Sequence, residues 1–166
     1  LCAADRHPGT VLHGRALCLL RRRCGPDRRK SAPAPRKSGA DPEAVRRADR
    51  VVLPGVGAFA DCKRGLASIP GMLEALDEAV TQRGVPFLGI CVGMQLLAEH
   101  GLEYETTKGL GWIDGDVIAI KPDDPELKIP HMGWNTVSYK KNQLLYQDMY
   151  EEARFYFVHS YLFESL

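Results

Sequence analysis

The chain has 166 residues, of which 45% are hydrophobic and 26% are charged, a composition typical of one globular domain that is large enough to bury a core. Its longest apolar run, near residues 85–94, is interrupted by Pro86 and Gly89 and is too short for a transmembrane helix, so no membrane association is expected. The five cysteines include no Cys-x-x-Cys pair, which argues against a disulfide framework or a paired zinc knuckle and favours a reduced, cytoplasmic protein.

The charge is divided unevenly along the chain. Residues 1–40 hold 10 of the 22 Lys and Arg residues but 2 of the 21 Asp and Glu residues, so residues 41–166 are net acidic. The stretch CGPDRRKSAPAPRKSGA is rich in Arg, Pro, Ala and Gly, and such a composition buries little apolar surface. A disordered tail and a basic arm for nucleic acid both remain open, although the arm lacks aromatic residues to stack on bases. We therefore separate an atypical basic segment, 1–40, from a domain at 41–166.

Regular structure is predicted from Asp41 onward. Asp41 followed by Pro42 predicts a short helix, because Asp is a good N-cap and Pro suits the first helical position. The next segment, RVVLPGVG at 50–57, predicts a short buried strand that ends in a glycine-flanked loop. Residues 65–83 carry Leu, Ile and Val at helical spacing with charges between them, which predicts one amphipathic helix.

Two further segments complete the α/β pattern. VPFLGI, at 85–90, is a continuous apolar run typical of a parallel strand covered on both faces, and VGMQLLAEH, at 92–100, is expected to continue as a helix that ends at His100. The alternation of strand and helix predicts an α/β fold with a mostly parallel sheet and helices on both faces. After Gly101, GDVIAI, WNTVSY and RFYFVHSYLF are strand-like, so a β-rich second half is expected.

Cys91 lies between Gly89 and Gly93 at the predicted strand-to-helix junction. A nucleophile at such an elbow has strained backbone angles and small neighbours, and its side chain is lifted above the carboxyl edge of the sheet, where α/β proteins bind ligands. The following amide, Val92 N–H, would then point towards an oxyanion. A buried structural cysteine with incidental glycines fits the same pattern, so this motif alone leaves both interpretations open.

A second glycine-rich loop, LPGVGAF at 53–59, also follows a predicted strand. Gly55 and Gly57 permit peptide orientations that a side chain would forbid, so this loop can bring a backbone N–H to the same oxyanion. Taken alone, a plain strand-to-loop turn is the simpler interpretation.

Five segments occur in order along the chain: LPGVGAF, FLGICVGMQLL, GLGWIDGDVIAI, KIPHMGWNTV and FYFVHSY. Together they closely resemble the glutamine amidotransferase subunits of imidazole glycerol phosphate synthases, over about residues 41–164. GICVGMQ is shared by class I glutamine amidotransferases in general, whereas PHMGWN together with FVHSY is particular to these subunits. The resemblance implies a class I glutamine amidotransferase-like fold and a role in histidine biosynthesis.

The resemblance also implies a reaction. Cys91 would attack the side-chain amide of glutamine, release ammonia and leave a γ-glutamyl thioester for water to hydrolyse. Val92 N–H and a flipped amide of the PGVG loop would form the oxyanion hole. The site residues implied in this way are Cys91 as the catalytic residue, Val92, Val56 and Gly57 in the oxyanion hole, and Gly55 and Gln95 at the bound glutamine. No cofactor and no metal is implied.

A partner is implied as well, since ammonia would pass to a separate (β/α)8-barrel cyclase subunit in a heterodimer. The segment that faces the cyclase would consist of His131, Met132, Gly133, Trp134, Asn135 and Tyr156. Trp134 is equally compatible with a core position. Reorganisation of the PGVG loop would couple cyclase occupancy to the glutaminase. No nucleic acid and no membrane is expected among the partners.

Two departures from the family separate the hypotheses. Class I amidotransferases take the catalytic base and its carboxylate from a His-Pro-Glu segment, and no His-x-Glu occurs in the 166 residues. A structural or interface role is expected for His159. Residues 1–40 match no family motif although their length is right, which favours a shifted reading frame there.

The leading hypothesis is a glutaminase subunit. The alternatives are a catalytically silent module that still binds the cyclase and a different α/β cysteine enzyme, against which PHMGWN argues.

Overall fold

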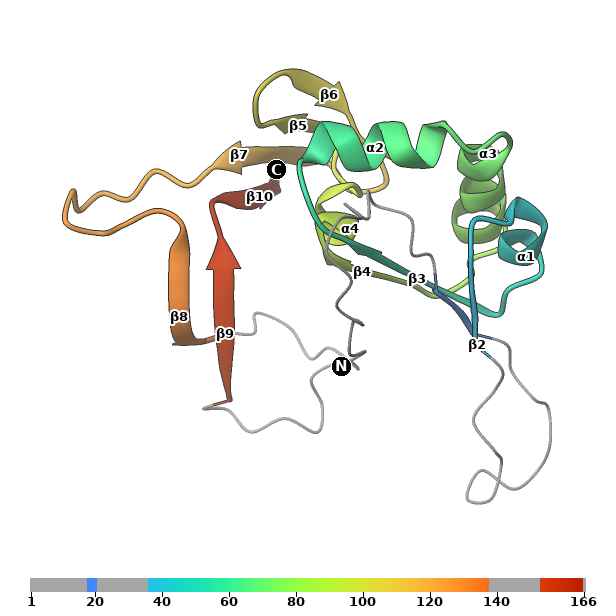
Figure 1. Ribbon diagram of the computed structural model, residues 1–166, viewed down its shortest axis with the longest axis horizontal. Coiled ribbons are helices and arrows are strands. Elements are labelled where there is room, and N and C mark those ends of the chain that lie inside the picture. The colour runs from blue at the N-terminus through green and yellow to red at the C-terminus, as the bar shows by residue number, and fades with distance from the viewer. Residues whose placement is uncertain (1–17, 21–35, 138–152, 166) are drawn as a thin grey trace, which may run out of the picture. The chain divides into compact units, whose positions relative to one another are not determined.

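The computed structural model describes residues 18–20, 36–137 and 153–165 (Figure 1). The helices are α1 (Pro42–Arg46), α2 (Phe59–Ala67), α3 (Met72–Asp77), the π-helix η1 (Glu78–Gln82) and α4 (Val92–Gln95). The strands are β1 (Cys18–Leu20), β2 (Arg36–Ser38), β3 (Arg50–Gly55), β4 (Phe87–Cys91), β5 (His100–Leu102), β6 (Thr106–Lys108), β7 (Gly115–Ala119), β8 (His131–Thr136), β9 (Arg154–His159) and β10 (Tyr161–Ser165). The predicted α/β class and the β-rich second half are both confirmed.

The described strands form sheets of mixed direction. Their orders are β2-β1-β3-β4, β10-β7-β5-β6 and β8-β9. Strand β3 is parallel to β4 and β5 is parallel to β7, but β1 is antiparallel to both β2 and β3. The parallel pairing expected of the central sheet is therefore found at β3–β4, while β1, between β2 and β3, runs in the opposite direction to its neighbours. The other residues of the basic segment up to position 35 lie outside the described part of the chain.

The chain divides into two compact units, one of Leu1–Val117 with Phe163–Leu166 and one of Ile118–Leu162. The first contains the β3–β4 pair and all the described helices, and the second contains the β8–β9 hairpin. The boundary at residue 40 stays a prediction.

Helix α1 begins as the sequence predicts. Asp41 has extended backbone angles, and its carboxylate accepts a hydrogen bond from the Glu43 amide at 3.0 Å, which satisfies one of the free N–H groups of the first turn. Pro42 occupies the first turn, where no amide hydrogen is needed. Val45 is fully buried, so this short helix is held by packing as well as by its cap.

The single helix predicted over 65–83 is wrong in its bounds. Helix α2 begins earlier, at Phe59, and ends at Ala67, and a second helical stretch starts only at Met72. Pro70 cannot donate a helical hydrogen bond, and Gly71 adopts a left-handed conformation with φ 76°, so the chain turns between the two helices. The apolar residues keep their predicted role, because Leu66 and Leu76 are buried.

The helix after Cys91 is also shorter than predicted, since α4 ends at Gln95 and His100 begins β5 instead of ending a helix. The reason is competition for carbonyl groups. The Leu96 carbonyl accepts the Leu110 amide at 2.7 Å, and the Leu97 carbonyl accepts the Trp112 amide at 2.9 Å. These acceptors serve the incoming segment, so they are not available to another helical turn.

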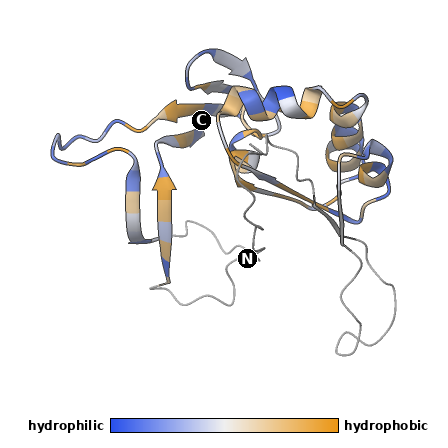
Figure 2. Cartoon of the chain, in the orientation of Figure 1, coloured by the Kyte–Doolittle hydropathy of each residue, from blue (hydrophilic) through white to orange (hydrophobic). Residues whose placement is uncertain are grey.

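The two faces of the β3–β4 pair differ in burial. Val51 and Leu53 are almost completely buried, and Figure 1 shows α2 and α3 along one side of this pair. Figure 2 shows hydrophobic residues along β3 and β4, whereas α2 alternates in hydropathy as a helix with one buried face does. On the opposite face of β4, Leu88 is 41% and Ile90 48% exposed, so the expectation that this strand is covered on both faces is not met.

Candidate active site

The strand-to-helix junction at Cys91 has the geometry of a nucleophile elbow. Cys91 is the last residue of β4 and the N-cap of α4, and its backbone angles are φ 56° and ψ −123°. Among the described residues it is the only one other than glycine with a positive φ. Its side chain is exposed and forms no disulfide. A β-carbon is strained at these angles, so the fold maintains an unfavourable backbone conformation at an exposed thiol.

The two glycines that flank Cys91 are required by close backbone packing. A β-carbon built on Gly93 would lie 1.8 Å from the Leu53 carbonyl oxygen of the neighbouring strand. One built on Gly89 would lie 2.5 Å from the Met94 Cα. Both obstacles are backbone atoms, which cannot rotate away as a side-chain end can. The glycines are therefore part of the elbow and not incidental, and Cys91 is exposed and not buried, whereas its role as a nucleophile stays a prediction.

The PGVG loop lies directly beside this elbow. In the parallel ladder Gly55 is opposite Cys91, and a β-carbon on Gly55 would lie 3.1 Å from the Gly93 amide nitrogen. Val56 is 81% exposed, and Gly57 has φ 117°, an angle that glycine adopts without strain. The backbone that the sequence singled out as a second amide source is thus adjacent to the cysteine.

A residue that the sequence analysis did not single out, Cys62, anchors the loop from α2. Its thiol donates to the Val56 carbonyl oxygen at 3.6 Å, and its side chain is only 4% exposed. Burial raises the pKa of the Cys62 thiol, with smaller contributions from Asp61 and Cys91, so the group stays a donor. A helical pattern counted from Phe59 would have placed Cys62 on the buried face.

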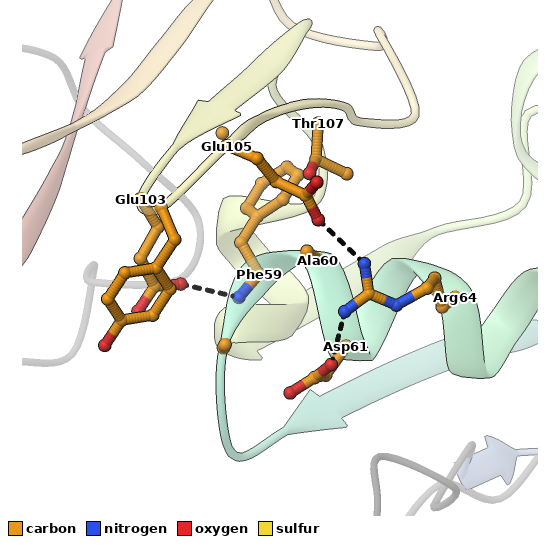
Figure 3. Close-up of a pocket in the computed structure, with 10 residues that line it drawn as sticks. Phe59, Ala60, Asp61, Arg64, Glu103, Glu105 and Thr107 are labelled. Atoms are coloured by element: carbon orange, nitrogen blue, oxygen red, sulfur yellow. Dashed lines mark hydrogen bonds and ion pairs between the residues drawn. The ribbon is translucent and has the colours of Figure 1, made fainter.

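A pocket of about 180 Å³ opens beside the start of α2, immediately after the loop (Figure 3). The Glu103 carboxylate accepts the Phe59 amide at 2.8 Å, and it therefore caps a helix whose N-cap, Ala58, has no side-chain acceptor. Arg64 donates to Asp61 at 2.6 Å and to Glu105 at 2.8 Å. The sequence carried no signal for Glu103, because its partner is 44 residues away.

Comparison with known proteins gives the family that the sequence motifs resemble. Residues 30–166 match the family described as Glutamine amidotransferase class-I. The chain belongs to this family. The imidazole glycerol phosphate synthase subunit HisH of Rhizobium meliloti (strain 1021) is 57% identical over 123 residues, which are 72% of this chain and 57% of that protein.

Two other relatives carry the same name. The HisH subunit of Rhodospirillum rubrum is 59% identical over 124 residues, 74% of this chain and 58% of the relative. The HisH subunit of Rhodopseudomonas palustris is 54% identical over 132 residues, 78% of this chain and 61% of the relative. The chain therefore spans less than two thirds of the length of these curated relatives.

The remaining predicted site residues fall in different places. Val92 heads α4 and is buried, and Gln95 ends the same helix half-buried, one turn beyond Cys91. Of the described histidines, His100 has its Nδ1 3.1 Å from Asp116 Oδ1 within the first unit, and His131 has its Nδ1 3.2 Å from His159 Nε2 within the second.

The residues predicted to face a partner lie on the β8–β9 hairpin, where they alternate between two faces. Met132 pairs with Val158 and Trp134 pairs with Tyr156, and these four side chains are all exposed on one face. The Trp134 and Tyr156 rings meet edge to face with centroids 5.6 Å apart. His131, Gly133 and Asn135 alternate onto the other face, so Trp134 is not a core residue. Val158 completes the apolar face and was missed by the sequence analysis.

None of the helices in the described part of the chain has the length and apolarity that a membrane span requires.

Proposed function

We propose that this chain is a glutaminase subunit of an imidazole glycerol phosphate synthase, which hydrolyses glutamine to glutamate and ammonia. The observation that carries the proposal is the strained and exposed Cys91, held between two glycines that admit no β-carbon. Strained backbone conformations of this kind cluster at active sites, and the nucleophile elbow is one example. Membership of the class I glutamine amidotransferases supplies the reaction class.

In the proposed reaction, the Cys91 sulfur attacks the side-chain carbonyl carbon of glutamine. The amide oxygen becomes an oxyanion that accepts hydrogen bonds from Val92 N–H and from an amide at Val56 or Gly57. The C–N bond then breaks, ammonia leaves with the proton that the thiol gave up, and a γ-glutamyl thioester remains on Cys91. Water adds to the thioester, and glutamate and the free thiol are regenerated. Gly55 and Gln95 border the proposed glutamine site.

The proposed destination of the ammonia is a cyclase subunit with a (β/α)8 barrel, bound as a heterodimer in the cytoplasm. The exposed face of Met132, Trp134, Tyr156 and Val158 supports a docking role, because aromatic and Met side chains are enriched in protein interfaces. His131, Gly133 and Asn135 would form the other side of the same docking segment. The names of the HisH relatives, each called a subunit, also support an assembly.

A catalytically silent module that binds the cyclase is the second candidate. It is the alternative that the sequence left open, and the comparisons do not favour it. A cysteine nucleophile of this kind needs a base within hydrogen-bond reach.

The deciding experiment measures glutamate release from glutamine by the chain mixed with a cyclase subunit, with Cys91→Ala as the test variant. Release that depends on the cyclase and disappears in Cys91→Ala supports the glutaminase. Docking without any release supports the silent module. Trp134→Ala should weaken docking in either case, and Tyr104→Ala, at an exposed aromatic residue outside the hairpin, is the matched control. If the chain neither releases glutamate nor docks to the cyclase, both candidates are overturned.

A further inference from the structure

The half-buried face of the β8–β9 hairpin carries two histidines that the proposed glutaminase chemistry does not use. His131 and His159 are directly opposite each other in the antiparallel ladder. His131 Nδ1 and His159 Nε2 are 3.2 Å apart, and the ring centroids are 5.3 Å apart. Phe157 stacks on the His131 ring with an interplanar angle of 16°, which restricts that ring. The hairpin therefore brings two imidazole nitrogens together at one point.

The hydrogen bonds determine which nitrogens hold protons. His159 Nδ1 lies 2.9 Å from the Tyr161 carbonyl oxygen, which can only accept, so this nitrogen is the donor. A neutral His159 ring then has its lone pair on Nε2, and His131 Nδ1 must donate to it. A histidine that binds a metal ion through one ring nitrogen commonly donates the N–H of the other to a backbone carbonyl or a carboxylate. His159 is thus already in the tautomer that a metal site requires.

The separation of the two nitrogens can be compared with the separation of two ligands on one metal ion. Two imidazole nitrogens at about 2.05 Å from a tetrahedral ion lie about 3.3 Å apart, whereas neighbouring ligands in a square plane lie about 2.9 Å apart. The observed 3.2 Å is closer to the tetrahedral value. Imidazole is a preferred ligand of Zn²⁺, which is commonly tetrahedral in proteins.

We propose that His131 Nδ1 and His159 Nε2 form a two-histidine site for Zn²⁺. Within the described residues no group of three or more His, Cys, Asp or Glu side chains could hold a metal, so water would fill the remaining two positions. Binding moves the His131 proton from Nδ1 to Nε2 through solvent, and both rings stay neutral. The ion replaces the hydrogen bond between the rings, and it links β8 to β9 at the end of the ladder where His131 and His159 pair.

The test is Zn²⁺ binding by the whole chain, measured by calorimetry, with Co²⁺ as the optical probe. His131→Gln and His159→Gln should each weaken binding at least tenfold, because each removes one of two protein ligands. His100→Gln, at a half-exposed histidine in the other unit, should leave the affinity unchanged. Equal affinity in the wild type and in both hairpin variants would overturn the site.

A second measurement does not depend on the variants folding. X-ray absorption at the zinc edge of the wild-type chain should show two imidazole ligands and no sulfur. A sulfur shell, or a thiolate-to-cobalt charge-transfer band, would place the ion on a cysteine and refute the proposal. Neither readout uses glutaminase activity, so a failure here is distinct from a failure of the proposed function.

Discussion

The close approach of α4 to β3 predicts that Gly93→Ala destabilises the protein severely. The added β-carbon would lie 1.8 Å from the Leu53 carbonyl oxygen and 2.8 Å from its carbon. Carbon–oxygen contacts in a packed interior are well above 3 Å, so the helix and the strand must separate by more than 1 Å. Overpacking of a rigid site costs about 1–3 kcal/mol, and the backbone obstacle puts this case at the upper end.

The higher helix propensity of Ala offsets part of this destabilisation, since Ala is favoured over Gly by up to about 1 kcal/mol in a helix. The net loss should therefore be about 2 kcal/mol, which corresponds to a melting temperature lower by about 4–8 °C for a chain of this size. The assay is urea and thermal unfolding of wild type, Gly93→Ala and Gly39→Ala. Gly39 has nothing within 4 Å of the same added atom, so it is the matched control. A Gly93→Ala variant within about 0.5 kcal/mol of wild type would refute the packing argument.

Three more changes test separate parts of the structure. Asp41→Ala removes the acceptor of the Glu43 amide and should cost about 1 kcal/mol in urea unfolding, whereas an unchanged midpoint would mean that the cap contributes nothing. Gly101→Ala would put a β-carbon 2.4 Å from the buried Phe59 ring, and a loss of about 1–3 kcal/mol is expected by the same assay; a neutral result would show that the ring can move. Because burial raises the pKa of Cys62, the unfolded chain loses that proton first, so the stability this thiol contributes is complete below about pH 8.5 and falls as the pH rises above it. Unfolding midpoints at about pH 7.5 and about pH 9.5 should therefore differ less in Cys62→Ala than in wild type, and an equal difference would contradict the assignment.

The elbow was the part of the site that local sequence described best. Gly89, Cys91 and Gly93 are so close in sequence that their spacing alone implies a tight junction, and the structure confirms it with a positive φ at the cysteine. The neighbouring loop was also recognisable, because its glycines follow a strand that pairs with β4 in parallel.

Features that depend on distant residues were not predictable in the same way. The helix after Cys91 ends early because the carbonyl groups of Leu96 and Leu97 accept amides from residues 110–113, and no local propensity reports that competition. The Glu103 cap of α2 joins residues 44 apart, and the Cys62 anchor depends on where α2 begins. No hydrophobic periodicity predicted secondary structure in the basic segment either, and the strands that the structure describes in it are only three residues long.

The alternation of side chains in the β8–β9 ladder places the histidine pair on one face and the aromatic pair on the other. The pairing that sets His131 against His159 also sets Trp134 against Tyr156 on the reverse side. A strand reverses its faces with every residue, so inserting one residue between His131 and Trp134 would bring the imidazole and the indole of β8 onto the same face and would separate Trp134 from Tyr156. The number of residues between these two side chains therefore matters to the hairpin as much as their identities do.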